Sequence, residues 1–207
     1  MSVEILYEDN DLVVINKPAD LLSVPGRGED KQDCAWRQVQ QAFPTARVVH
    51  RLDYATSGIL VFALNLDAQR GLSQAFQQRQ TEKHYIAVLN GTLKDDQGTV
   101  DLPLRCDWDN RPLQIVDHQQ GKAALTHWQK MADETAGSRV LLQPVTGRSH
   151  QLRVHMQALG HPIIGDRFYA PPESLQNRDR MLLHAEALSL PHPKTGEALH
   201  FFAACPF

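Results

Sequence analysis

The chain has 207 residues, of which 42% are hydrophobic and 22% are charged, and its formal net charge is −3. This composition is that of a globular protein of one domain, which we expect to span residues 1–207, and it excludes an intrinsically disordered chain. The slight excess of acidic groups argues against a general nucleic-acid binder with a broad basic face. No apolar run approaches the roughly 20 residues of a membrane span, and the acidic start MSVEILYEDND does not resemble a signal peptide, so we expect a cytoplasmic protein.

The first elements in chain order are two short strands and a helix. Val3–Tyr7 and Leu12–Asn16 are predicted strands, joined by the acidic turn at residues 8–11. A loop rich in proline and glycine follows. Asp33 is then predicted to cap a helix that ends before Pro44.

The middle and end of the chain are rich in predicted strands. The continuous apolar run Ile59–Leu64 predicts a buried strand, and Asp67 to Arg79 is predicted to be a polar surface helix. The further strand candidates are His84–Leu89, Ala123–Trp128, Arg139–Val145, Met181–Leu190 and Ala198–Phe202.

Ser149–Leu159 has the pattern of a third helix. Leu152, Met156 and Leu159 share one helical face, and Gly160 stands where a helix would stop. Because strands outnumber helices and do not alternate with them regularly, we predict an α+β fold with a mixed sheet. The polar segments Arg105–Gln114 and Ala170–Arg180 are predicted to be the most mobile.

The first candidate for chemistry is Asp53, on the segment just before the apolar run at Ile59. Arg51 is two residues earlier, on the same side if the segment is extended. A nearby cation favours the ionised carboxylate, which can act as a nucleophile or a base. The alternative is that Asp53 only caps the turn around Thr56.

Two further segments carry candidate side chains. Arg148 lies between a strand end and a helix start, where it could bind phosphate or pair with a carboxylate, or be an ordinary surface arginine. Tyr85 lies on a predicted strand, where its ring either packs in the sheet or stacks on a nucleobase.

A metal site is not predicted. His150, His155 and His161 are five and six residues apart, whereas zinc ligands on a helix are commonly three or four apart because such pairs share a face. The cysteines Cys34, Cys106 and Cys205 are widely spaced, so free thiols are expected.

Residues 50–58, HRLDYATSG, resemble the HRLDxxTSG signature of the RluA-type pseudouridine synthases. Segments at 12–18, 24–26, 83–87, 146–155, 161–166 and 182–185 resemble the other motifs of that family, in the expected order. Residues 101–112 and 165–170 resemble the short dual-specificity members, which act on ribosomal RNA and tRNA. The resemblance covers nearly the whole chain.

The resemblance implies a mixed, largely antiparallel central sheet flanked by helices and loops, with the active site in a cleft across the sheet. It implies a single catalytic domain without the N-terminal S4 RNA-binding domain of many relatives. The partner would be RNA, in large-subunit rRNA and tRNA stem-loops, with no cofactor and no metal. A monomer is the expected state.

The resemblance also implies residue roles. Asp53 would be the nucleophile that isomerises uridine to pseudouridine, attacking either C1′ of the ribose or C6 of the uracil. Tyr85 would pack against the flipped uracil and assist proton removal. Arg148 would pair with Asp53, Arg51 would fill the gap left in the RNA stack, and Leu183 would line the base pocket.

A local RNA surface is expected in place of a broad basic face. Its candidates are His50, Arg51, Thr56, Arg148, Arg153 and Arg167. For Arg153 and Arg167 the alternative is an internal salt bridge.

Two rival functions remain open from the residues. One is a catalytically inert RNA-binding module or folding chaperone, which the presence of Asp53, Tyr85 and Arg148 disfavours. The other is a glycosidase acting on nucleosides, which usually needs a second carboxyl group about 5–10 Å from the first. No paired carboxylate accompanies Asp53 in the sequence.

Overall fold

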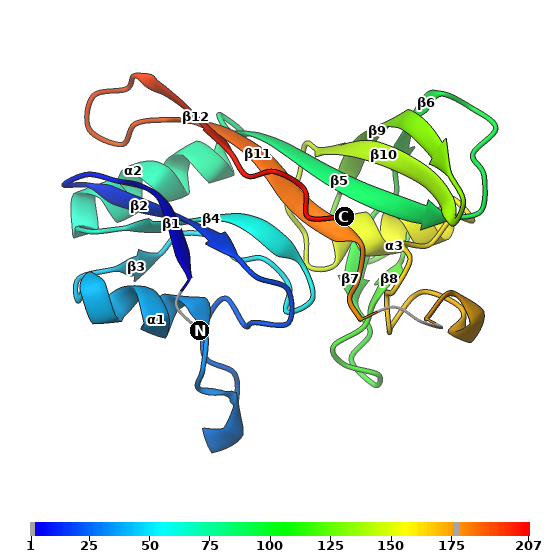
Figure 1. Ribbon diagram of the computed structural model, residues 1–207, viewed down its shortest axis with the longest axis horizontal. Coiled ribbons are helices and arrows are strands. Elements are labelled where there is room, and N and C mark those ends of the chain that lie inside the picture. The colour runs from blue at the N-terminus through cyan, green and yellow to red at the C-terminus, as the bar shows by residue number, and fades with distance from the viewer. Residues whose placement is uncertain (1–2, 176–178) are drawn as a thin grey trace. The chain divides into compact units, whose positions relative to one another are not determined.

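The computed structural model describes residues 3–175 and 179–207 (Figure 1). Its contacts divide the chain into two compact units. The first comprises Met1–Lys83 and His184–Pro206, and the second comprises His84–Leu183 with Phe207. None of the helices among the described residues is long and apolar enough to cross a membrane.

The first unit is built on a sheet whose strands follow the order β1, β2, β4, β11, with β12 paired to β11 and β3 paired to β4. The strands are β1 (Glu4–Glu8), β2 (Leu12–Lys17), β3 (Arg47–Val48), β4 (Ser57–Ala63), β11 (Leu183–Pro191) and β12 (Ala198–Phe202). The helices are η1 (Glu29–Lys31), α1 (Ala35–Ala42) and α2 (Leu66–Gln77). β4 runs parallel to β11, and the other pairings are antiparallel.

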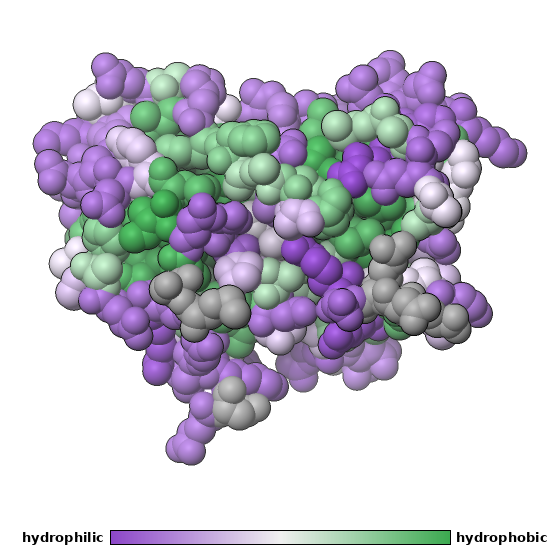
Figure 2. Space-filling view, in the orientation of Figure 1, coloured by the Kyte–Doolittle hydropathy of each residue, from purple (hydrophilic) through white to green (hydrophobic). Residues whose placement is uncertain are grey.

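β2 and β4 are the central strands of the first unit, and both read as continuous apolar runs because both of their faces are buried. On one face Val14, Ile59 and Val61 pack with Leu72 of α2. Side chains alternate along a strand, so Ile15 and Leu60, which are also fully buried, lie on the other face. Figure 2 shows hydrophobic residues gathered over the strands of the first unit, on the left of the view, with hydrophilic residues around them.

The second unit contains strands in the order β5, β10, β9, β6, and a separate hairpin of β7 and β8. The strands are β5 (Glu82–Asn90), β6 (Gln97–Asp101), β7 (Leu104–Cys106), β8 (Gln114–Val116), β9 (Leu125–Glu134) and β10 (Gly137–Pro144). The helices are α3 (Gln151–Ala158) and the short η2 (Pro172–Leu175). β5 pairs with β10, β10 with β9, β9 with β6, and β7 with β8, and these pairings are all antiparallel.

The α+β class and the mostly antiparallel sheet predicted from the sequence are confirmed. The acidic turn between the first two strands forms because Asp9 Oδ1 accepts hydrogen bonds from the backbone N–H groups of Asp11, at 2.7 Å, and Leu12, at 2.9 Å. This is the local bonding by which aspartate favours turns. The single domain over residues 1–207 stays a prediction.

Two predicted helix starts are wrong. α1 has Cys34 as its N-cap, without a side-chain cap bond, and Asp33 instead accepts a hydrogen bond from the Gln38 side chain at 2.9 Å. α2 begins at Leu66, because the side chain of Asn65 caps it by accepting from the Ala68 N–H at 2.8 Å. Asp67 lies inside the first turn.

The third helix is confirmed as α3, with Leu152 and Met156 buried. Its other residues over 151–156 are buried as well, so the helix has no polar outer face over this stretch. The polar side chains of this stretch, Gln151, Arg153 and His155, form hydrogen bonds inside the protein. The segment Arg105–Gln114, predicted to be a loop, contains parts of the β7–β8 hairpin. The expected mobile segment Ala170–Arg180 contains η2, and its residues 176–178 lie outside the described part of the chain.

Candidate active site

Asp53 lies on the loop between β3 and β4, and the backbone on each side of it is fixed. The hydroxyl of Ser23 accepts from the Leu52 N–H at 3.0 Å and donates to the Leu52 carbonyl at 2.7 Å. The Asp53 carbonyl accepts from the Thr56 N–H at 3.1 Å, which closes a turn. Asp53 is half-buried at the start of this turn. A side chain on a loop pinned in this way is held in one place before substrate arrives.

Lys17 supplies the second anchor of the loop, although no role was predicted for this residue. It is fully buried at the end of β2. Its ammonium group donates to the carbonyls of Pro18 at 2.9 Å, Leu21 at 2.7 Å and Tyr54 at 3.2 Å. An ammonium has three N–H donors, so these bonds account for all of them. The signals in the sequence are a lysine at the end of a largely apolar strand and its place in the family-like segment at residues 12–18.

Of the signature residues, Ser57 and Gly58 join β4 to β11, where they pair with His184 and Ala185. Gly58 has φ +113°, and a Cβ there would lie 2.2 Å from the carbonyl oxygen of Ala185. Only glycine fits where the neighbouring backbone comes so close. The buried hydroxyl of Ser57 hydrogen-bonds Nδ1 of His184 at 2.8 Å. Thr56 is also buried, and its contact with RNA stays a prediction.

His50 is held inside the first unit. Its Nε2 accepts from the Val61 N–H at 3.0 Å, and its ring stacks on Phe76 with centroids 4.6 Å apart. Desolvation and the neighbouring Lys83 lower the pKa of His50 from 6.5 to about 3. The imidazole is therefore neutral at physiological pH, and the contact of His50 with RNA stays a prediction. Arg51, the next residue, is exposed.

In the second unit, the loop that carries Arg148 is organised by the buried amide of Gln151. The Oε1 atom of Gln151 accepts from the Arg148 N–H at 3.0 Å and from the Thr146 hydroxyl at 2.7 Å. Its Nε2 donates to the Leu125 carbonyl and the Thr126 hydroxyl, both at 3.0 Å. The exposed side chain of Arg148 donates from Nε to the Ala123 carbonyl at 3.1 Å.

Arg153 forms the internal ion pair that the sequence left as an alternative. Its guanidinium donates two hydrogen bonds to the carboxylate of Asp166, each at 2.7 Å, and both residues are buried. This fork-to-fork geometry is the strong form of the pair. Arg153 is thus committed to the interior, whereas Arg167, the residue after Asp166, is exposed.

The remaining predicted residues lie on strands. Tyr85 is half-buried on β5, where it is paired across the ladder with Leu142 of β10. Leu183 is buried at the first position of β11. Asp53, His50, Arg51 and Thr56 belong to the first unit, and the other predicted residues belong to the second. The predicted Asp53–Arg148 pair joins the two units and stays a prediction.

The histidines of the second unit that suggested a metal have separate partners. His155 hydrogen-bonds the Thr126 hydroxyl at 2.9 Å and the Leu102 carbonyl at 3.0 Å. Burial lowers the pKa of His155. His161 Nδ1 hydrogen-bonds the Asn90 carbonyl at 2.9 Å.

Asp9, Asp11 and His192 form one group whose ligand atoms lie within 4.8 Å of one another. The Nδ1 atom of His192 accepts from the backbone N–H groups of Lys194 and Thr195, so in the neutral ring the proton is on Nε2. That N–H faces Asp9 Oδ2 at 3.1 Å. The ring is therefore a hydrogen-bond donor to the carboxylate, and the arrangement is not that of a metal ligand.

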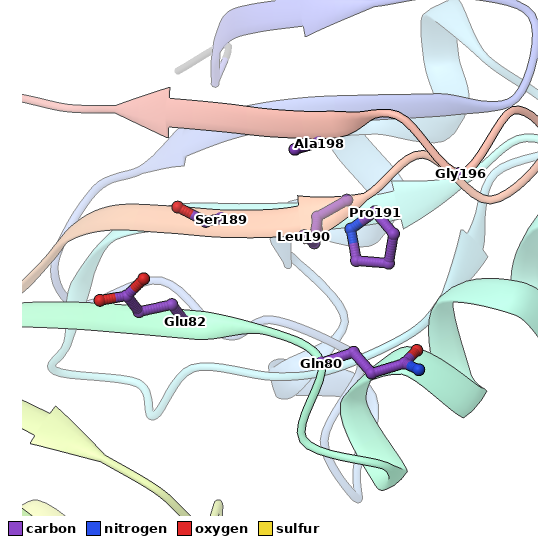
Figure 3. Close-up of a pocket in the computed structure, with 7 residues that line it drawn as sticks. All are labelled: Gln80, Glu82, Ser189, Leu190, Pro191, Gly196 and Ala198. Atoms are coloured by element: carbon purple, nitrogen blue, oxygen red, sulfur yellow. The ribbon is translucent and has the colours of Figure 1, made fainter.

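The first unit also has a surface hollow of 420 Å³ (Figure 3). It is lined by Gln80, Glu82, Ser189, Leu190, Pro191, Gly196 and Ala198. In Figure 3 the side chains of Gln80 and Glu82 extend in opposite directions. Ligand sites usually bring a few polar groups together on an apolar wall, and this hollow does not.

Comparison with known proteins gives the family. Residues 11–158 match the model of the RNA pseudouridylate synthase family. The chain is 50% identical over 98% of its length to the "Dual-specificity RNA pseudouridine synthase RluA" of Yersinia pestis, covering 99% of that protein. It is 51% identical over 98% of its length to the Escherichia coli K12 protein of the same name, covering 93% of it.

Solved structures agree. "Human RNA Pseudouridylate Synthase Domain Containing 1" superposes with a TM-score of 0.84 at 33% identity, covering 100% of this chain and 84% of that chain. "Human RNA Pseudouridylate Synthase Domain Containing 4" superposes with a TM-score of 0.76 at 26% identity, covering 98% and 88%. The resemblance seen in the sequence motifs is confirmed. The chain belongs to the RluA-type pseudouridine synthases, the enzymes that isomerise uridine to pseudouridine in RNA.

Proposed function

We propose that this synthase modifies both large-subunit ribosomal RNA and tRNA anticodon stem-loops. The observation that carries the proposal is the identity of 50–51% over 98% of the chain to relatives that are named as dual-specificity enzymes. We further propose that the protein acts as a monomer in the cytoplasm, where these RNAs are modified.

Asp53 is proposed as the nucleophile. An ionised carboxylate can form a covalent intermediate at a glycosyl carbon. The position of Asp53 supports the role, because the hydroxyl of Ser23 and the ammonium of Lys17 hold the backbone on either side of it. Attack at C1′ of the ribose and addition at C6 of the uracil both remain open.

The bonds that break and form during the isomerisation determine what the active site must do. The bond from N1 of uracil to C1′ breaks, the bond from C5 to C1′ forms, the C5 proton leaves and N1 gains a proton. No electrons are exchanged with a partner and no water is consumed, so the proposal assigns no cofactor. The base must turn within its site while its ribose stays in the chain, which requires that it leave the RNA stack.

The other roles follow from this requirement. Tyr85 is proposed to pack against the flipped uracil and to assist the loss of its C5 proton. Leu183 is proposed to line the base pocket, and Arg51 to occupy the gap left in the RNA stack. Arg148 is proposed to hold the Asp53 carboxylate ionised and oriented.

Tritium release from RNA labelled at C5 of uracil tests the proposal, since that hydrogen is lost when C5 joins the ribose. A tRNA anticodon stem-loop and a large-subunit rRNA stem-loop are the substrates, and free uridine is the control. Release from both RNAs and not from uridine is expected. Release from one RNA alone contradicts dual specificity, and release from neither contradicts the proposed substrates. Free uracil formed from uridine would favour a nucleoside glycosidase.

A further inference from the structure

Phe168, in the second unit, is a large apolar side chain that remains 49% exposed. It follows the buried Asp166 and the exposed Arg167 on the segment after α3. An exposed aromatic ring beside a surface arginine has the two groups that single-stranded nucleic acids use, a stacking face and a cation for phosphate. The proposed catalytic roles do not involve Phe168.

The backbone beneath the ring is fixed. The Oδ1 atom of Asp166 accepts hydrogen bonds from the N–H groups of Phe168 at 3.0 Å and Tyr169 at 3.3 Å. Asp166 is itself held by the two hydrogen bonds from Arg153. The Phe168 backbone is therefore held in place before any ligand binds, and little conformational freedom is left to lose on binding.

The ring is also supported by its neighbours. The imidazole of His150 stacks against it, with centroids 5.8 Å apart and planes 24° apart. The Cζ atom of Arg153 lies 5.2 Å from its centroid. His150 in turn hydrogen-bonds the hydroxyl of Tyr169 at 2.7 Å. With these neighbours in place Phe168 is still 49% exposed, so part of the ring remains accessible to a base.

The charge around Phe168 suits a polyanion. Asp166, the residue two before Phe168, is buried and paired with Arg153, and Arg167, the residue directly before Phe168, is exposed and positively charged.

We propose that Phe168 stacks on a nucleobase of the RNA substrate while Arg167 contacts the adjacent phosphate, forming a binding subsite on the second unit. The inference rests on the RNA pseudouridine synthase activity. The competing explanation is that Phe168 only shields the Arg153–Asp166 pair from water. The two explanations predict different effects of leucine at position 168. An aliphatic side chain can shield the ion pair from water, but it cannot stack on a base.

The test compares Phe168→Ala, Phe168→Leu and Phe168→Trp with Phe202→Ala, which removes a phenylalanine of β12 that is 64% exposed. The KM and Kd for the two stem-loops, kcat at saturating RNA and the melting temperature are measured. Stacking predicts that Phe168→Ala and Phe168→Leu weaken RNA binding about 10-fold, with kcat unchanged and the melting temperature within about 3 °C. Phe168→Trp and Phe202→Ala should bind like the wild type.

Restoration of binding by Phe168→Leu would overturn the proposal, as would a fall in melting temperature without a change in KM. Tryptophan emission of Phe168→Trp, after subtraction of the wild-type signal, gives a direct readout that needs no turnover. It should be quenched when RNA binds. If the wild type modifies neither stem-loop, the proposed substrates are wrong, and the same emission measurement with total ribosomal RNA decides the stacking proposal. Unchanged emission then contradicts it.

Discussion

The Nε2 atom of His50 accepts a hydrogen bond from the backbone N–H of Val61 at 3.0 Å, across the loop that leads to Asp53. β4 pairs with β11 at Ser57 and Gly58, and with β3 at residues 62–63. Val61 lies between these two pairings. Its backbone N–H is bonded by the His50 imidazole, where a neighbouring strand would otherwise supply the acceptor. A buried N–H without a partner would cost about 1–3 kcal/mol.

This bond predicts a pH dependence of stability. The pKa of His50 is lowered from 6.5 to about 3 in the folded protein. As the pH falls through this interval, the unfolded chain binds a proton that the folded chain does not, so the free energy of unfolding declines. Well above pH 6.5 His50 is neutral in both the folded and the unfolded chain, so it contributes nothing to the pH dependence of the unfolding free energy. His50→Gln keeps an acceptor but cannot titrate, so its stability should decline less on acidification.

Urea unfolding at several pH values between about 7 and about 4 checks this prediction. The exposed His118, replaced by Gln, is the matched control and should retain the wild-type slope. Equal slopes for the wild type and His50→Gln would show that His50 is protonated in the folded state.

The Arg153–Asp166 pair predicts that replacing Arg153 costs far more stability than replacing Arg167, the arginine that follows Asp166. Arg153→Ala leaves the Asp166 carboxylate buried without its partner, which should cost about 3–5 kcal/mol of unfolding free energy. Arg167→Ala removes an exposed side chain and should change stability by less than about 0.5 kcal/mol. Chemical denaturation measures both. A small loss for Arg153→Ala would mean that the pair contributes little.

Replacement by alanine is predicted to lower stability strongly at Gly58 and hardly at all at Gly147. At Gly58 the added Cβ would lie 2.2 Å from the Ala185 carbonyl oxygen and the backbone has φ +113°, so Gly58→Ala should destabilise by more than about 3 kcal/mol. At Gly147 nothing lies within 4 Å of an added Cβ. Gly147→Ala should stay within about 0.5 kcal/mol of the wild type. Thermal unfolding of both variants is the measurement, and similar melting temperatures would contradict the described approach of β4 to β11.

Arg148→Ala is predicted to lower kcat while the fold is retained. Its side chain is exposed, and Gln151 holds the loop through the backbone N–H, which alanine keeps. The unfolding free energy should therefore change by less than about 1 kcal/mol. At a temperature where both variants are folded, Arg148→Ala should lose more activity than Arg153→Ala. The reverse order would remove Arg148 from the proposed catalytic role.

The sequence predicted best where one physical signal dominates. The apolar run at Ile59–Leu64 and the run beginning at Leu12 gave correct central strands, because burial on both faces leaves a continuous pattern. The edge strand β6 was missed because only Val100 of its residues is buried. Ser149–Leu159 was correctly predicted to be helical, but its three-residue apolar face could not reveal that Gln151 and Arg153 are also buried.

Among the site residues, local pattern identified Asp53 as a candidate, and family resemblance supplied its proposed role. Local pattern could not assign a role to Lys17. A lysine is ordinarily exposed, and the partners of this one come from separate parts of the first unit. Local pattern also could not separate Arg153 from Arg167, because the partner of a buried charge is a tertiary property. The bond of the His50 ring to Val61, on the strand that follows its loop, is likewise a tertiary property.

The most direct test of the central claim is tritium release from C5-labelled stem-loop RNA by the wild type, Asp53→Asn and the control Asp67→Asn. Asp67 is an exposed carboxylate in the first turn of α2. The account predicts release by the wild type and Asp67→Asn, and none by Asp53→Asn although that variant still binds the RNA. Substantial release by Asp53→Asn would contradict the assignment of Asp53 as the nucleophile.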